Sequence, residues 1–299
     1  WHLSGSSNGD ADSPARLGID HYAGLLTGSH QSYHTVRLTQ NGVGSTVNQY
    51  ATTLFTDLAL SWLEDQASPW FLWLAYTAPH APFHLPPDSL HYSQGLSDDP
   101  AAIDADPLSY YLAMLEAMDT EMGRILDAVD RQNTIVIFIG DNGPPTAVAQ
   151  LPYRPRRVKG TVYQGGLQVP LVVSGAGVDR AGQREAALVS SVDLFATIAE
   201  LAGTEGQDSH DSQSFVGLLG DASAPARTHV YAQIGGDAPA FAIRDSTYKL
   251  IDFGGGSRQL FNLALDPYER SDLLADDLDS EAAAALVSLE ETALFLRTP

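Results

Sequence analysis

Residues 134–143, which read TIVIFIGDNG, constrain the fold of this chain more than any other segment. The run TIVIFI is apolar or β-branched, which is typical of a buried strand in a parallel or mixed sheet. An acid and an amide, Asp141 and Asn142, follow it between two glycines. Because ligands of open α/β sheets bind beyond the carboxyl ends of the strands, the segment predicts a binding site here. Read alone, GDNG is also typical of an ordinary Asx-Gly turn.

Three further residues carry chemistry that could complete such a site. His80 follows a short apolar run, Lys159 opens a glycine-rich loop, and His2 stands at the start of the chain. The side-chain oxygens of Asp141 and Asn142 suit a hard cation such as Ca²⁺, with Mg²⁺ as the less favoured ion. A cation and an ammonium group can neutralise an oxyanion while an imidazole protonates a leaving group. Taken singly, each residue also fits a turn or a solvated loop, so the prediction depends on the set.

The spacing of apolar residues predicts alternating helices and strands in the first two thirds of the chain. Apolar stripes at helical spacing predict helices, and short apolar runs predict strands. The predicted helices cover residues 50–65, 109–132 and 192–202, and the predicted strands cover residues 70–76, 134–139 and 169–174. Residues 4–48 and 84–107 show little periodicity and are predicted as surface loops. This alternation indicates an α/β fold with helices layered on a sheet.

A polar stretch, residues 203–227, separates this region from a smaller C-terminal part. The four strand-like runs of that part cover residues 228–234, 240–244, 248–253 and 258–263, and an Ala- and Leu-rich helix follows over residues 281–296. Three glycines, residues 254–256, supply a hairpin turn. We therefore predict an α/β domain over residues 1–215 and a small antiparallel sheet with a packed helix over residues 216–299.

The chain is strongly acidic, with a formal net charge of −21. This charge argues against nucleic acid or an anionic membrane as a partner, because both would be repelled. An anionic substrate would need a local cationic site, and the densest one comprises Tyr153, Arg154, Arg156 and Arg157. This group could steer a polyanionic sugar, or it could be a solvated loop. The absence of cysteine excludes disulfides and thiolate metal sites and leaves the redox compartment open.

The motifs of this chain, in their order, resemble those of the type I sulfatases of the alkaline phosphatase superfamily. Three matches lie at the candidate site: APHAP at residues 78–82 resembles Ala-Pro-His-x-Pro, GDNG resembles Ser-Asp-Asn-Gly, and KGTVYQGGLQVP at residues 159–170 resembles Lys-Gly-x-x-x-Glu-Gly-Gly-x-Arg-Val-Pro. Further matches are WHL at residues 1–3, GIDHYAG at 18–24, MLEAMDTEMGR at 114–124, SVDL at 191–194, YKL at 248–250 and LFNLALDPYERSDL at 260–273. The resemblance covers nearly the whole chain.

The resemblance implies an alkaline-phosphatase-like layered α/β/α fold. It also implies that the protein hydrolyses sulfate monoesters, with a sulfated small molecule or glycan as the substrate. It implies that Asp141 and Asn142 are two ligands of a Ca²⁺ ion. It also implies that Lys159 and His80 bind the sulfate oxygens and the leaving-group side, while His2 hydrogen-bonds near the nucleophile. In the family the nucleophile is a formylglycine hydrate, which attacks sulfur and later expels sulfate through hemiacetal collapse. Export is common in the family, so a periplasmic or extracellular location fits the resemblance.

The chain departs from the family pattern at the nucleophile. Formylglycine is made from a Cys or Ser in a Cys/Ser-x-Pro-x-Arg motif, and this chain has no Cys. The segment SPAR at residues 13–16 has the wrong spacing and follows the Trp-His-Leu motif instead of preceding it, so we assign it no catalytic role. The family's paired Asp ligands and motif Arg are also missing. We expect these pieces to lie upstream of Trp1, and we expect the present residues alone to be inactive.

Two exchanges affect the glycine-rich loop itself. Gln164 stands where the family has Glu, and Gln168 stands where the family has Arg. One acid and one base are replaced together, so the local charge stays balanced. We interpret the exchange as a structural pair lost as a unit and not as a loss of activity.

Two other functions remain open on the sequence. A phosphodiesterase or phosphonate monoester hydrolase of the same superfamily would share the fold, because fold alone does not separate these activities. A catalytically inactive sulfatase-like domain that binds sulfated glycans or a partner protein would keep the fold without the nucleophile. The sequence does not indicate the oligomeric state.

Overall fold

The computed structural model describes residues 10–26, 31–67, 69–204, 210–235 and 239–297. The chain divides into two compact units, Trp1–Asp130 and Arg131–Pro299, which we call the N-terminal and C-terminal units. Each unit is described by itself. The domain boundary that the sequence places at residue 215 is not tested by this division and stays a prediction.

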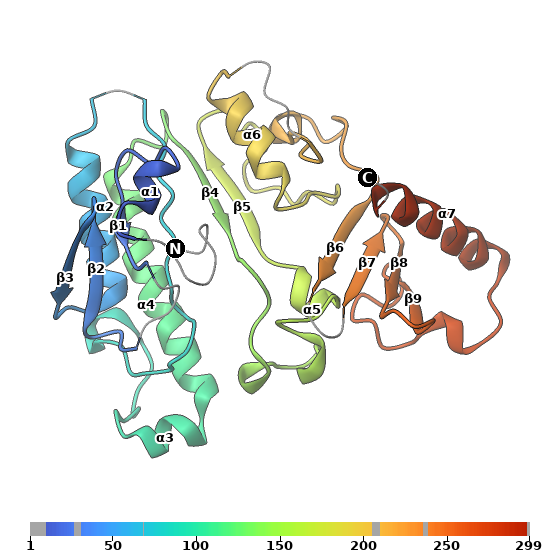
Figure 1. Cartoon of the computed structure of the whole chain (residues 1–299), viewed down its shortest axis with the longest axis horizontal. Coiled ribbons are helices and arrows are strands. Elements are labelled where there is room, and N and C mark those ends of the chain that lie inside the picture. The colour runs from blue at the N-terminus through green and yellow to red at the C-terminus, as the bar shows by residue number, and fades with distance from the viewer. Residues whose placement is uncertain (1–9, 27–30, 68, 205–209, 236–238, 298–299) are drawn as a thin grey trace. The chain divides into compact units, whose positions relative to one another are not determined.

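Two helices dominate the N-terminal unit, α2 (Ala51–Glu64) and α4 (Pro107–Ala128), and they lie side by side (Figure 1). Both confirm the helices predicted from apolar stripes. The start of α4 is set by Asp106, whose carboxylate accepts the Ser109 amide, and by Pro107 in the first turn. The core between the two helices includes Leu54, Phe55 and Met114, all buried. Two short helices, α1 (Ser13–Arg16) and α3 (Pro100–Ala105), complete the helical part of this unit.

An antiparallel sheet lies in the segment predicted to be irregular. Its strands are β1 (Ala23–Gly24), β2 (Val36–Gln40) and β3 (Val43–Val47), in that order. Asn41 and Gly42 form the β2–β3 turn with φ values of 46° and 84°. Two residues of positive φ are the requirement of a tight hairpin turn. The prediction of a loop over residues 4–48 was therefore wrong for this part, because the Asn-Gly turn signal was overlooked.

The predicted strand at residues 70–76 pairs with no other strand in the described part of the chain. Its side chains nevertheless alternate as in a strand. Leu72, Leu74 and Tyr76 are half-buried, whereas Phe71 and Trp73 are 65% and 66% exposed. The prediction of a strand over residues 70–76 was therefore wrong for the described residues, because a strand also needs a hydrogen-bonded neighbour, which local sequence does not supply.

In the C-terminal unit, β4 (Ile135–Ile139) is the strand that precedes the GDNG turn. It pairs antiparallel with β5 (Leu171–Gly175), and Ile139 lies opposite Leu171. All five residues of β4 are half-buried. The strand was predicted correctly, but the expectation of a fully buried strand in a parallel or mixed sheet was wrong for the described residues, because β4 is half-buried and pairs antiparallel with β5 after a long connection over residues 140–170.

A second sheet of the C-terminal unit contains β6 (Val230–Ile234), β7 (Ala240–Arg244), β8 (Tyr248–Asp252) and β9 (Arg258–Asn262), all antiparallel and in that order. Helix α7 (Ser280–Arg297) packs on one face of this sheet (Figure 1). The opposite face packs against Val162 and Tyr163. The four strands, the turn at glycines 254–256 and the final helix confirm the sequence prediction.

The remaining elements connect these parts. The C-terminal unit also contains α5 (Gln164–Leu167) and α6 (Asp193–Leu201). Short 3₁₀ turns cover Asp88–Leu90, Thr146–Val148, Pro155–Arg157, Val216–Leu219 and Leu273–Ala275. Helix α6 confirms the helix predicted over residues 192–202.

Candidate active site

The GDNG turn begins where β4 ends. The Gly140 amide donates to the carbonyl oxygen of Pro170 at 3.0 Å, which ties the turn to the start of β5. Inside the turn, Oδ1 of Asp141 accepts the Asn142 amide at 2.8 Å. The Asp141 side chain is exposed and Asn142 is half-buried. The turn is therefore an Asx-type turn, and its exposed carboxylate can still take a ligand through Oδ2.

Residues 157–168, which we call the Lys159 loop, are bonded to this turn through the backbone. The Lys159 amide donates to the carbonyl oxygen of Pro144 at 3.1 Å, and the Gly143 amide donates to that of Gly166 at 3.0 Å. The Lys159 side chain is exposed. The structure thus places Lys159 on a loop that is directly bonded to the turn carrying Asp141 and Asn142.

The glycines of these two segments allow a very close backbone approach. A Cβ atom on Gly143 would lie 1.7 Å from the carbonyl oxygen of Gly165. A Cβ on Gly165 would lie 2.4 Å from the Arg157 carbonyl oxygen, and one on Gly166 would lie 2.4 Å from that of Thr161. All three contacts are shorter than any side chain tolerates, so these glycines are required by packing and are not ordinary turn residues.

A buried polar group, which we call the Lys249 cluster, comprises Lys249, Glu269 and Gln164. Lys249 on β8 and Glu269 are each 1% exposed. The Lys249 ammonium donates to Oε1 of Glu269 at 2.6 Å and to Oε1 of Gln164 at 3.3 Å. The second Glu269 oxygen, Oε2, accepts the Gln164 amide at 2.6 Å. Burial lowers the pKa of Lys249 to about 8, against the opposing effect of Glu269.

Sequence reasoning did not find this cluster. A signal was present, because Lys159 and Lys249 are the only two lysines of the chain. Lys249 also lies in a strand whose other residues from Tyr248 to Ile251 are apolar, where an unpaired charge would be costly. Lys249 and Glu269 both lie in motifs that match the family, YKL at residues 248–250 and LFNLALDPYERSDL at residues 260–273, but neither motif shows that the two side chains meet.

Gln164 and Gln168 contact each other across one turn of α5. Nε2 of Gln164 donates to Oε1 of Gln168 at 3.4 Å. This contact supports the interpretation of the two exchanges as a structural pair. Whether they affect activity stays a prediction.

Arg157 does not belong to a free cationic patch. Its guanidinium donates to the carbonyl oxygen of Glu269 and lies over the ring of Tyr163, 4.3 Å from the ring centroid. Arg154 and Arg156 are exposed, and they line a surface hollow of about 490 Å³ together with Pro155 and the half-buried Arg157. Of the three arginines grouped by the sequence, two remain candidates for steering an anion and one supports the Lys159 loop.

His80 belongs to the N-terminal unit, and His2 lies outside the described residues. The His80 ring is exposed, and its Nδ1 lies 2.8 Å from the Ala81 carbonyl oxygen, which can only accept. We therefore assign the proton to Nδ1, which leaves Nε2 to face a ligand. The buried Tyr33 hydroxyl donates to the carbonyl oxygens of Thr77 and His80 at 2.9 and 2.8 Å, which fixes this segment. Burial raises the pKa of Tyr33, so the hydroxyl stays a donor.

The structure also gives the SPAR segment a local role. Ser13 is 4% exposed in α1, and Arg16 forms an ion pair with Asp10 at 2.6 Å. Arg16 also donates to the Ser13 hydroxyl at 3.0 Å. These contacts give the segment a structural explanation and give no support to a catalytic one.

The side-chain oxygens of Asp141 and Asn142 are the type of ligand that Ca²⁺ prefers, which is carboxylate and carbonyl oxygen. Two residues are too few to complete a Ca²⁺ site, because Ca²⁺ takes about six to eight oxygen ligands. Among the described residues, no group of three or more His, Cys, Asp or Glu side chains is placed to hold a metal ion. Asp141 and Asn142 can therefore be part of a metal site but do not complete one.

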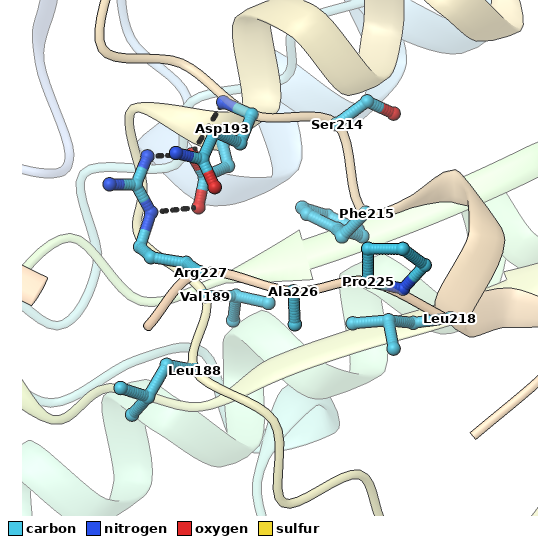
Figure 2. Close-up of a pocket in the computed structure, with 10 residues that line it drawn as sticks. Leu188, Val189, Asp193, Ser214, Phe215, Leu218, Pro225, Ala226 and Arg227 are labelled. Atoms are coloured by element: carbon cyan, nitrogen blue, oxygen red, sulfur yellow. Dashed lines mark hydrogen bonds and ion pairs between the residues drawn. The ribbon is translucent and has the colours of Figure 1, made fainter. Parts of the chain in front are cut away.

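A separate cavity of about 190 Å³ lies beside α6 (Figure 2). Its polar feature is the ion pair of Asp193 and Arg227, in which Nε of Arg227 donates to Oδ2 of Asp193 at 2.9 Å. Asp193 also accepts the amides of Ser190 and Gln213, at 2.8 and 2.9 Å. Burial opposes ionisation, but these hydrogen bonds bring the pKa of Asp193 below its usual value. Because both carboxylate oxygens already accept two hydrogen bonds, the pair is structural.

Within the described residues, no helix is long and apolar enough to cross a membrane.

The exposed ammonium of Lys159 lies on a loop that is bonded to the acid–amide turn, and such a group can neutralise an oxyanion. The chain matches the model of the Sulfatase family over residues 1–204 and therefore belongs to the sulfatase family. The model "N-sulphoglucosamine sulphohydrolase, C-terminal" matches residues 158–292. The family resemblance inferred from the motifs is thereby confirmed.

Known proteins agree with this assignment. A sulfatase of Formosa agariphila is 31% identical over 52% of this chain, and the match spans 31% of that protein. The multifunctional alkaline phosphatase superfamily protein PehA of Trinickia caryophylli is 26% identical over 79% of this chain, and the match spans 57% of that protein. The present chain thus spans less than two thirds of the length of these relatives.

A solved structure confirms the fold. The crystal structure of Ps i-CgsB superposes with a TM-score of 0.78 and 25% identity, over 93% of this chain and 67% of that chain. The same protein has been solved in complex with k-i-k-neocarrahexaose. The predicted alkaline-phosphatase-like α/β fold is thereby confirmed.

Proposed function

We propose that the protein hydrolyses sulfate monoesters at the GDNG turn and the Lys159 loop. The observation that carries the proposal is the backbone bonding of these two segments in a member of the sulfatase family. The Gly143–Gly166 and Lys159–Pro144 hydrogen bonds bring an ammonium group and two oxygen donors into one region. A sulfate group needs this combination, because its oxygens carry the charge that must be stabilised during S–O cleavage.

The residues have distinct roles in this proposal. The exposed Lys159 ammonium binds sulfate oxygens and neutralises their charge. Asp141 and Asn142 would supply two ligands to a Ca²⁺ ion, completed by groups outside the described residues. When bound, that ion would polarise the sulfate oxygens as a Lewis acid. His80 would bind on the leaving-group side and, when its ring is doubly protonated, donate a proton from Nε2 to the departing alcohol.

The proposal also requires a nucleophile, and the family resemblance implies a formylglycine. No residue of this chain is assigned that role, since the chain has no Cys and Ser13 is buried in α1. His2 would hydrogen-bond near the nucleophile, as the resemblance implies.

We propose a sulfated glycan as the substrate class, with a smaller sulfated molecule as the alternative. A similar structure, that of Ps i-CgsB, has been solved with a bound neocarrahexaose. The exposed Arg154 and Arg156 support a polyanionic substrate. No acidic residue lies between Asp141 and Asp179, although the chain as a whole carries a net charge of −21. This stretch of sequence therefore carries no negative charge of its own, although Glu269 from another segment bonds to the Lys159 loop.

A phosphate diester or phosphonate monoester is the second candidate substrate. The similarity to the multifunctional alkaline phosphatase superfamily protein PehA supports it. Phosphoryl and sulfuryl groups present similar charged oxygens, so the residues described above would serve both. The nucleophile is the group that would distinguish them.

The test compares chromogenic aryl sulfate and aryl phosphodiester substrates with the protein as its gene encodes it. We expect kcat/KM to favour the sulfate ester, and we expect Lys159→Ala and Asp141→Ala each to lower it by roughly 10²- to 10³-fold. Arg184→Ala, at an exposed arginine of the same unit, is the matched control and should leave it unchanged. A preference for the phosphodiester would favour the second candidate. No turnover of either, with retained binding of sulfated glycans, would favour an inactive binding domain.

A further inference from the structure

We propose that the buried Lys249–Glu269 pair is a positioning device that holds the Lys159 loop, and through it the GDNG turn, in the geometry of the active site. The inference deepens the proposed function and rests on it for its catalytic part. Both residues lie in motifs that match the family, and the resemblance assigns neither of them a role.

The free energy needed to bury the charges of Lys249 and Glu269 is too large for stability alone to explain the pair. Lys249 and Glu269 are each 1% exposed, and their nearest surroundings include the buried Ile251 and Phe261. Taking two charges out of water costs several kcal/mol per ion, and well-packed apolar residues often serve stability equally well. A buried ion pair is better explained when it fixes one arrangement among several, because its partners must meet at defined distances and angles.

Glu269 bonds to the Lys159 loop at two separate points. Its side-chain Oε2 accepts the Gln164 amide at 2.6 Å, near the end of the loop. Its main-chain carbonyl oxygen accepts the guanidinium of Arg157, at the beginning of the loop. Lys249 holds the carboxylate from β8 at 2.6 Å and also donates to the Gln164 side chain. The loop that presents Lys159 is thereby fixed at both ends to one buried group.

The backbone of Glu269 supports this interpretation. Its φ is +55°, a left-handed conformation that is unfavourable for a residue with a long side chain. Such a conformation persists only where surrounding contacts determine it, and it occurs preferentially at functional sites. Here the strained residue is also the one that bonds to both ends of the loop.

The loop in turn fixes the GDNG turn. Gly166 accepts the Gly143 amide at 3.0 Å, and Pro144 accepts the Lys159 amide at 3.1 Å. The space between Gly143 and Gly165 leaves no room for a single added carbon. A shift of the loop must therefore move the turn that carries Asp141 and Asn142, because the contact cannot absorb the displacement.

The first test uses the fact that the chain has two lysines. Amine acylation at neutral pH, read by mass spectrometry, should modify the exposed Lys159 and spare the buried Lys249. In Glu269→Gln we expect Lys249 to become reactive, and we expect amide hydrogen exchange across residues 157–168 to rise by at least about tenfold. The matched control is Arg227→Met, which breaks another buried ion pair of the same unit. It should leave exchange in residues 157–168 unchanged.

The second test separates positioning from stability by activity on an aryl sulfate. Lys249→Met/Glu269→Met replaces both charges with apolar groups and should lower the thermal midpoint less than Glu269→Gln does, because no unpaired charge stays buried. It also removes the acceptor of the Gln164 amide, so we expect kcat to fall by roughly 10- to 100-fold with a smaller change in KM. Arg227→Met should lower the thermal midpoint while leaving kcat unchanged. If the pair had only a structural role, kcat would fall in whichever variant has the lower thermal midpoint.

The outcomes distinguish the two proposals. If exchange in residues 157–168 stays at its wild-type value in folded Glu269→Gln, or rises equally in Arg227→Met, the positioning device is refuted whatever the activity. If Glu269→Gln loosens the loop but the wild-type protein hydrolyses no sulfate ester, the loop anchor stands and the proposed function fails. If the wild type is active and Lys249→Met/Glu269→Met keeps full kcat, the catalytic part of the inference fails.

Discussion

At the scale of single residues, the pKa of Lys249 shows how burial and nearby charges act together on one side chain. Glu269 from the segment after β9 and Arg244 from β7 are the charges that act on it, the first favouring its protonated form and the second opposing it. Burial outweighs both and lowers the pKa of Lys249 to about 8, from 10.5 for an unperturbed lysine. The unfolded chain therefore binds this proton more tightly than the folded protein does.

This difference makes stability depend on pH in a defined direction. The contribution of Lys249 to the free energy of unfolding should rise between pH 8 and 10.5, by at most about 3 kcal/mol, and should be lost as the pH falls through about 8. The measurement is the urea midpoint of the wild type relative to Lys249→Met/Glu269→Met at pH 7, 8.5 and 10. Arg258→Met, in an exposed ion pair with Glu290, is the control and should show no such rise. A flat difference between wild type and double variant would show that Lys249 keeps its proton throughout.

At the scale of elements, the site consists of two loops that are shaped by glycine and not by regular structure. The GDNG turn and the Lys159 loop meet where a Cβ on Gly143 would lie 1.7 Å from the Gly165 carbonyl oxygen. Hydrogen bonds on both sides of this contact, at Gly143 and at Lys159, keep the two loops together. Hydrogen bonds and close packing thus join the two loops directly.

Gly143→Ala tests this packing directly. The added carbon cannot be accommodated without separating the loops, so we expect a loss of about 1–3 kcal/mol of stability and a larger proportional loss of sulfate ester hydrolysis. Gly235→Ala is the control in the same unit, because a Cβ there meets no atom within 4 Å. It should change stability by less than about 0.5 kcal/mol. Wild-type activity in a folded Gly143→Ala protein would contradict the proposed arrangement.

At the scale of the whole molecule, the charge distribution is the property that bears most on function. The net charge is −21, yet the segment from Asn142 to Val178 contains no acid and carries Arg154, Arg156 and Lys159. For the proposed sulfated substrate, the exposed Arg154 and Arg156 would supply a local attraction against the repulsion of the acidic chain. The attraction should weaken with salt, because charges on the surface are screened over about 10 Å at 0.1 M.

Substitution of Arg154 and Arg156 tests whether these two exposed arginines attract an anionic substrate. Arg154→Ser/Arg156→Ser should raise KM for a sulfated oligosaccharide several-fold at low salt and should lose this effect near 1 M salt, where screening extends only about 3 Å. Arg131→Ser/Arg184→Ser removes the same charge from exposed positions of the same unit and is the matched control. An equal rise of KM in both double variants would show that net charge, and not this patch, is responsible. Arg157 is left out because it holds the Lys159 loop.

The sequence by itself determined the elements whose signals are local. Apolar stripes predicted α2, α4, α6 and α7, and short apolar runs with glycine turns predicted β4 to β9. The motifs also selected Asp141, Asn142 and Lys159, and the structure joins their segments through backbone hydrogen bonds. Local spacing suffices for these features because helix periodicity and turn chemistry depend on neighbouring residues.

Only the tertiary structure decided which segments pair and which charges meet. In the structure, residues 70–76 have no hydrogen-bonded neighbour among the described strands, and β4 pairs antiparallel with β5. Arg157 bonds to the Glu269 carbonyl oxygen, and Lys249 bonds to the side chain of Glu269, 20 residues further along the chain. The physical reason is common to these cases. Strand pairing and buried ion pairs are contacts between segments that the fold brings together, and a residue's own neighbours in sequence carry no information about which distant partner it will meet.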